Sequence, residues 1–260
     1  MDNKLTILKL SEKIKAYIEE VKKETGYNVS IKSFPGKGAR VTLDHERKYI
    51  RVKINEGEFK KESEEEIDYT IAHEVTHEFL SLKKKYCRIN LVNCGPEERK
   101  AVFFLQTMIE DIVVDKIIHE KNYISYFTTY LDNVKRDIKF ICDKGKGGYF
   151  CEKYNDPTYK STNKAMIFSY ILAWGYLTYS NSDKIDKKTL YKHLKIFQKL
   201  CPKHYEEAKK IKEIIFKNDI FTTEGYNNAI KECLYLWNLK DLVDVYICVK
   251  KNGNYDRKSI

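Results

Sequence analysis

The first 60 residues change from a helical to an alternating pattern of apolar positions. Between residues 5 and 23 the apolar side chains fall near one face of a helix. In residues 29–54 apolar and polar residues alternate instead, interrupted by a glycine-bearing loop at 33–38 and a turn at 44–47. This pattern predicts an amphipathic helix followed by two or three short antiparallel strands.

Helix-start signals mark the next two elements. Ser63 and Glu66 have the spacing of a capping box, in which each side chain satisfies a free backbone N–H group of the first turn. We expect this helix to run to about residue 82. Pro96 stands at the first position of a second helix, expected to end near residue 119.

Only helical patterns follow residue 123. They predict helices at about 124–141, 162–179, 187–200, 203–217 and 226–248. The chain is therefore expected to be α+β, with a small N-terminal antiparallel sheet and a mainly α-helical C-terminal half. We predict lobes at 1–122 and 123–260, or one continuous domain.

Composition indicates a soluble, globular, intracellular protein. The chain has 260 residues, of which 42% are hydrophobic and 33% charged. Its longest weakly polar run, 165–179, is shorter than the roughly 20 residues that a spanning helix needs, so no membrane association is expected. The N-terminus lacks the pattern of a secretory signal. Seven cysteines without CxxC spacing favour a reduced, cytoplasmic chain.

The net charge of +10 is concentrated in the second half. Residues 131–260 hold 25 basic against 16 acidic residues, whereas residues 1–130 hold 23 against 22. This excess has two explanations, a solvated lysine-rich surface or a surface that binds nucleic acid. Lysine outnumbers arginine 41 to 7, whereas proteins that recognise a nucleic-acid sequence favour arginine. Binding to nucleic acid therefore stays an open alternative.

The strongest chemical signal is the sequence HEVTH at residues 73–77, inside the capped helix. His73 and His77 are four residues apart, so they share one helix face and can converge on one ion. Glu74 lies about 100° around the axis, beside that ion. A water molecule between Zn²⁺ and this carboxylate would be acidified by the metal, and Glu74 could take its proton.

The longer segment TIAHEVTHEF, residues 70–79, resembles the signature of the zincin metallopeptidases. Glu78 departs from it, because the family usually has an uncharged residue there. The resemblance covers about residues 40–120 and implies a zincin-like fold, one zinc ion and a peptide or protein substrate. The H-x-x-G-x-x-H continuation of the metzincin branch is missing after His77.

A third ligand is expected from the helix at 96–119, whose apolar residues go nearly all round and predict burial. Carboxylates buried there need a partner or a metal. In the gluzincin branch a second helix donates an acid, which here implies Glu110 as the third ligand. Asp111 is the alternative. Asp115 would act in the second shell, orienting a ligand histidine through its free ring N–H.

The remaining histidines carry weaker signals. His119, near the end of the acidic helix, is an alternative ligand but is expected to cap that helix. His193 and His204 lie in the helical half, where we expect structural or surface roles.

Together these observations predict a gluzincin-like zinc metallopeptidase in which Glu74 activates the hydrolytic water. A non-catalytic zincin-like protein that uses zinc structurally is the alternative, and so is a protease recruited to nucleic acid by its basic half.

Overall fold

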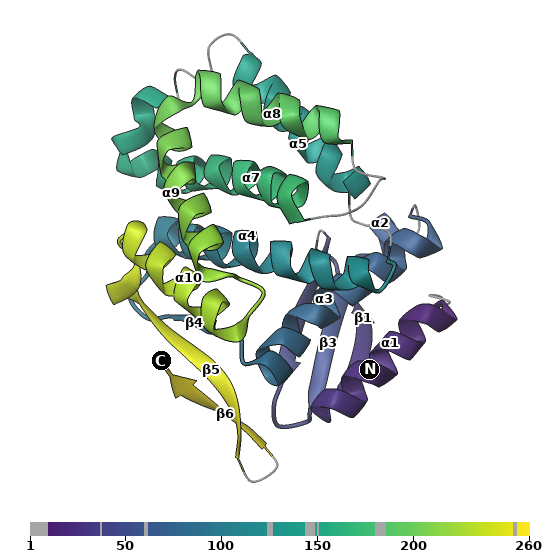
Figure 1. Cartoon of the computed structure of the whole chain (residues 1–260). Coiled ribbons are helices and arrows are strands. Elements are labelled where there is room, and N and C mark those ends of the chain that lie inside the picture. The colour runs from purple at the N-terminus through teal and green to yellow at the C-terminus, as the bar shows by residue number, and fades with distance from the viewer. Residues whose placement is uncertain are drawn as a thin grey trace. The chain divides into compact units, whose positions relative to one another are not determined.

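The computed structural model describes residues 10–36, 38–59, 62–123, 127–143, 149, 151–179, 186–251 and 254–260. These residues form mainly α-helices and two small three-stranded sheets (Figure 1). The predicted α+β class is confirmed. The chain divides into two compact units. The first comprises residues 1–86, 117–126 and 247–258, and the second comprises 87–116, 127–246 and 259–260.

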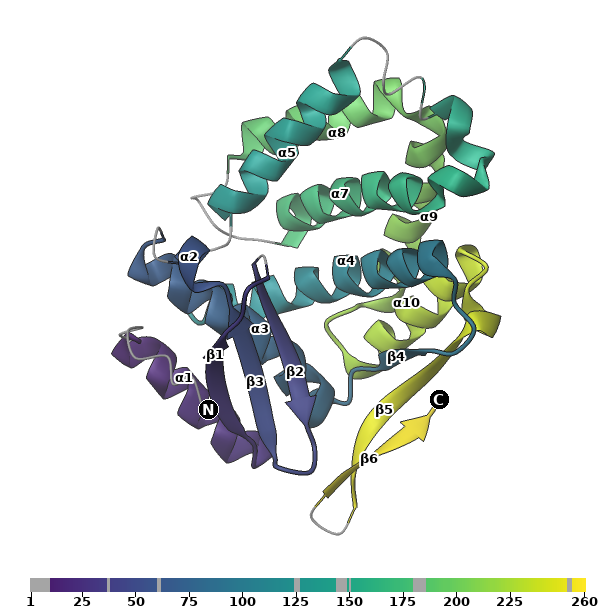
Figure 2. The same ribbon diagram turned by 180° about the vertical axis from the view of Figure 1, so that it is seen from behind.

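The first unit contains a three-stranded sheet formed by β1 (Asn28–Ser33), β2 (Ala39–Asp44) and β3 (Tyr49–Ile54). The strand order is β1-β3-β2, as Figure 2 shows. β2 is antiparallel to β3, as predicted, but β1 runs parallel to β3, so the prediction of a wholly antiparallel sheet is wrong. Alternation of side chains fixes which face of a strand is buried, and it does not fix the partner or direction of the strand.

Helices α1 (Glu12–Thr25) and α3 (Glu64–Lys84) complete the core of this unit, with the short α2 (Glu56–Phe59) between β3 and α3. The capping box is confirmed, because Ser63 and Glu66 exchange side-chain-to-backbone hydrogen bonds. α3 packs against α1, β2 and β3. It buries the face that carries Ile71, Ala72 and Val75. Burial of a side chain as large as Ile71 or Val75 contributes about 1.5–3 kcal/mol.

The second unit is helical. It contains most of α4 (Pro96–Glu120), together with α5 (Phe127–Cys142), α7 (Lys160–Tyr179), α8 (Lys187–Leu200), α9 (Pro202–Asn218) and α10 (Thr223–Leu236). α7 packs against α8 and α9, and α5 packs against α8. A Cβ atom at Gly175 of α7 would lie 2.3 Å from Cδ1 of Ile112. The absence of a side chain at Gly175 therefore lets α7 approach α4 closely at Ile112.

The prediction of helices alone after residue 123 is wrong at the C-terminus. α10 ends at Leu236, and the chain continues as β5 (Val243–Lys251) and β6 (Asn254–Ser259). With β4 (Arg88–Leu91) they form a sheet of order β4-β5-β6, in which β4 is antiparallel to β5. The partner of β5 lies about 150 residues earlier in the chain, so local periodicity did not reveal the pairing. Among the described helices, none has both the length and the hydropathy needed to cross a bilayer.

Candidate metal centre

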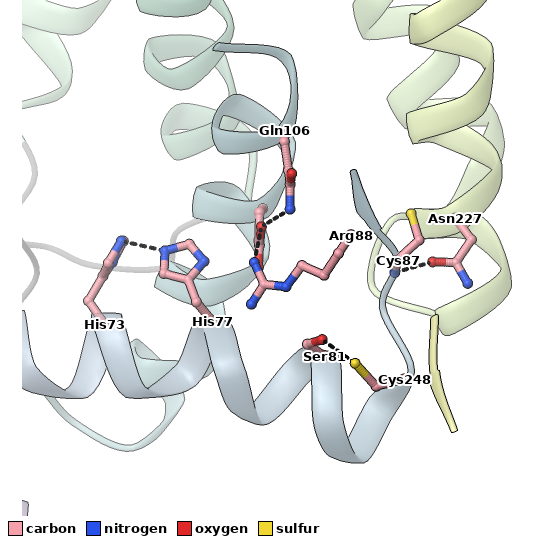
Figure 3. Close-up of polar contacts among 9 residues, drawn as sticks. His73, His77, Ser81, Cys87, Arg88, Gln106, Asn227 and Cys248 are labelled. Atoms are coloured by element: carbon pink, nitrogen blue, oxygen red, sulfur yellow. Dashed lines mark hydrogen bonds and ion pairs between the residues drawn. The ribbon is translucent and has the colours of Figure 1, made fainter. Parts of the chain in front are cut away.

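Helix α3 presents His73 and His77 one turn apart, beside its buried apolar face. Both rings are partly exposed. Their Nε2 atoms are 3.1 Å apart, as the dashed line in Figure 3 marks. The ring centroids are 4.8 Å apart and the rings are nearly perpendicular. The two imidazoles therefore converge, as the HExxH spacing predicts.

The convergence of these two nitrogen atoms is typical of a ligand pair. Two ring nitrogens can hydrogen bond to each other only when one of them carries a proton. Two imidazole nitrogens that bind one zinc ion at about 2.0–2.1 Å in tetrahedral geometry are roughly 3.3 Å apart. The observed separation is close to that value. A single helical turn thus places two nitrogen atoms at the separation that two zinc ligands would have.

The two glutamates of this segment lie in different environments. Glu74 is partly exposed and follows His73 directly on the helix. Glu78, the departure from the zincin signature, is only 8% exposed. Its negative charge acts on His45 in the turn between β2 and β3, where it opposes the lowering of the His45 pKa by burial. Glu78 therefore belongs to the side of α3 that faces the sheet.

Glu110 is held by two partners within the second unit. Its side chain is 4% exposed, and Nη1 of Arg88 lies 3.2 Å from its Oε1. Gln106, one turn earlier on α4, donates from Nε2 to Oε2 at 3.2 Å. Figure 3 shows Arg88 and Gln106 approaching the same side chain from β4 and α4. The carboxylate is therefore charge-compensated without a metal ion.

Asp111 is the partly exposed neighbour of Glu110 on α4. Together with His73 and His77 it makes a set of residue types, two imidazoles and one carboxylate, that could hold a metal ion. Asp115 lies one turn beyond Asp111 and is 8% exposed. That Asp115 orients a ligand histidine through its free ring N–H stays a prediction.

Tyr69 is a neighbour of the histidine pair that the sequence analysis did not identify. Its hydroxyl lies 3.4 Å from Nδ1 of His73, and its side chain is 2% exposed. The spacing of four residues before His73 is the signal that could have found it. Tyr69, His73 and His77 therefore lie along one side of α3, one residue per turn.

Two other histidines are fully buried in the second unit. His204 contacts Asn163 through Nε2 at 2.9 Å and Cys151 through Nδ1 at 3.6 Å. Nε2 of His193 lies 3.3 Å from the hydroxyl of Ser169. Burial lowers the pKa of both rings to about 4, so both are neutral at pH 7. His119 is partly exposed in the last turn of α4.

Comparisons with known proteins add no relative to this description. No protein-family model matches the chain, and searches of curated proteins and of solved structures give no significant match.

Proposed function

We propose that this chain is a zinc-dependent metallopeptidase in which His73, His77 and Asp111 hold one Zn²⁺ ion. The observation that carries the proposal is the pair of Nε2 atoms 3.1 Å apart within an HExxH helix. Asp111 offers a carboxylate oxygen, which is the kind of third ligand that such a histidine pair needs. Two imidazoles and one carboxylate are a donor set of catalytic zinc sites, and three protein ligands leave one position open for water.

The environments of the two acids favour Asp111 over Glu110 as the third ligand. Glu110 already forms an ion pair with Arg88 and accepts a hydrogen bond from Gln106. Taking Glu110 to a metal would break its ion pair with Arg88, whose side chain is 19% exposed. Breaking a mostly buried ion pair is costly. Asp111 is therefore the alternative that we adopt.

Glu74 would act as the general base. It follows His73 on the same rigid turn and is accessible to solvent. In this role its carboxylate takes a proton from the water that attacks the peptide carbonyl, and it then passes that proton to the leaving amine. Bound zinc would supply Lewis acidity, which lowers the pKa of a coordinated water and polarises the carbonyl. The proposed substrates are peptides or proteins, and the proposed fold of the first unit is zincin-like.

Replacing Glu74 by glutamine tests this assignment. The amide keeps the size of the side chain but cannot accept the proton, so hydrolysis of a peptide mixture should fall by at least about 100-fold. Zinc content should stay near one equivalent, because Glu74 is not a ligand. Mass spectrometry of the peptides and metal analysis of the protein give the two readings.

Glu65→Gln is the matched control, because it removes an exposed carboxylate from the first turn of the same helix. This variant should keep both zinc and activity. Peptide hydrolysis by Glu74→Gln at the rate of the unmodified protein would remove the proposed mechanism.

A further inference from the structure

Tyr69 and His73 form a contact that fixes one nitrogen of the imidazole ring. The phenol oxygen faces Nδ1 of His73 at 3.4 Å, and the ring centroids are 5.8 Å apart. Nε2 of the same ring faces Nε2 of His77. The two nitrogens of His73 therefore have separate neighbours, a hydroxyl on one side and a second imidazole on the other.

This division determines which tautomer of His73 can bind a metal. A neutral imidazole carries one proton, and the nitrogen that binds a metal must be the other one. If Nε2 is the ligand atom, Nδ1 carries the proton and needs an acceptor. The oxygen of Tyr69 is placed to accept it. Metal-bound histidines commonly donate their second ring N–H in this way.

Burial of the Tyr69 ring and its place on α3 fix the position of its hydroxyl oxygen. Tyr69 is among the largest fully buried side chains of the chain. It comes from α3, one turn before His73, so the distance between them depends on a single helical turn. A buried ring on the same helix has few alternative rotamers, which makes its hydroxyl a fixed reference for the imidazole.

We propose that Tyr69 is a positioning residue of the metal centre, whose hydroxyl accepts the Nδ1 proton of His73 and directs Nε2 toward the ion. This inference rests on the proposed zinc site but not on its peptidase activity. Loss of a partner of this kind typically weakens metal binding by about 10–100-fold.

The test compares the zinc affinities of Tyr69→Phe and Tyr17→Phe by competition with a chromophoric chelator. Tyr17 is a matched control, because it is also buried and its hydroxyl also bonds to α3, through Thr76 Oγ1 at 2.7 Å. Its hydroxyl, however, bonds to Thr76 and not to a ligand histidine. Thermal melts of the metal-free variants show whether each one folds.

We expect Tyr69→Phe to bind zinc about 10–100-fold more weakly than the unmodified protein. The zinc affinity of Tyr17→Phe should stay within roughly threefold of that of the unmodified protein. This should hold even if the melting temperature of Tyr17→Phe falls as much as that of Tyr69→Phe. A merely structural role for Tyr69 would make the two variants alike, and that result would overturn the inference while leaving the zinc site intact. Failure of the unmodified protein to bind zinc would overturn the proposed site instead.

A second measurement uses the unmodified protein and does not depend on the folding of a variant. In the zinc-loaded protein, the Nδ1 proton of His73 should be visible in ¹⁵N-edited NMR spectra, with a cross-peak to the ring protons of Tyr69. A proton held in a hydrogen bond exchanges slowly enough to be seen, whereas one exposed to water does not. The absence of this signal would also overturn the inference.

Discussion

The histidines of helix α3 and those of the helical unit differ in what surrounds their ring nitrogens. His73 and His77 are partly exposed, and each directs Nε2 at the other. His193 and His204 are fully buried, and the protein supplies Ser169 to one ring and Asn163 and Cys151 to the other. One residue type thus occurs in two settings within one chain.

A strongly perturbed pKa does not by itself identify a functional site. Burial lowers the pKa values of His193 and His204 strongly, because it disfavours the charged ring. Their hydrogen bonds go to neutral groups of the protein. The pair on α3 stands out by its geometry, because two potential metal-binding nitrogens converge. Perturbed groups are only candidates for function, and structural networks perturb pKa values as well.

The largest expected effect is a loss of folding stability at low pH, caused by the buried rings of His193 and His204. The folded-state pKa of about 4 lies below the unfolded value of about 6.5. Between these two values the unfolded chain binds protons at these rings and the folded chain does not. The free energy of unfolding is therefore fully present above pH 6.5 and declines toward pH 4. Each ring should cost about 2 kcal/mol between pH 7 and pH 5.

Urea unfolding across this pH range, together with ¹H NMR titration of the two C2 protons, measures the effect. Both rings should titrate below pH 5 in the folded protein. Titration of either ring near 6.5 would show that its burial does not keep it neutral, and the contrast between the two settings would weaken.

The second effect separates the neighbouring acids on α4. Asp111→Asn should weaken zinc binding by about 100-fold or more, because loss of an outer partner alone costs 10–100-fold. Glu110→Gln should keep zinc within a few-fold but lower the free energy of unfolding by about 1–3 kcal/mol, because Arg88 loses its charged partner. Zinc titration and urea unfolding of both variants measure these effects. If the assignment is right, Asp111→Asn mainly loses zinc affinity and Glu110→Gln mainly loses stability. The reverse pattern would return the ligand role to Glu110.

Local sequence signals predicted the framework of the candidate site. Ser63 and Glu66 indicated where α3 begins, and the HExxH spacing predicted that His73 and His77 converge. The choice between Glu110 and Asp111 could not be made from sequence, because it depends on Arg88, which comes from another element. Such contacts are set by packing, and no local spacing encodes them.

The same limit applies to the fold. The helices from α4 to α9 follow apolar periodicity, with ends close to those predicted. The pairings of β1 with β3 and of β4 with β5 join segments that are distant in sequence. Val243 and Val245 alternate with polar residues and could have suggested a strand. Their partner, Arg88–Leu91, is a four-residue strand with too short a pattern to be recognised.

The most direct test of the central claim is a crystal structure of the zinc-soaked protein with anomalous diffraction data collected at the zinc absorption edge. One peak is expected about 2 Å from Nε2 of His73, Nε2 of His77 and a carboxylate oxygen of Asp111. A peak bound by other side chains, or no peak beside a folded α3, would contradict the account.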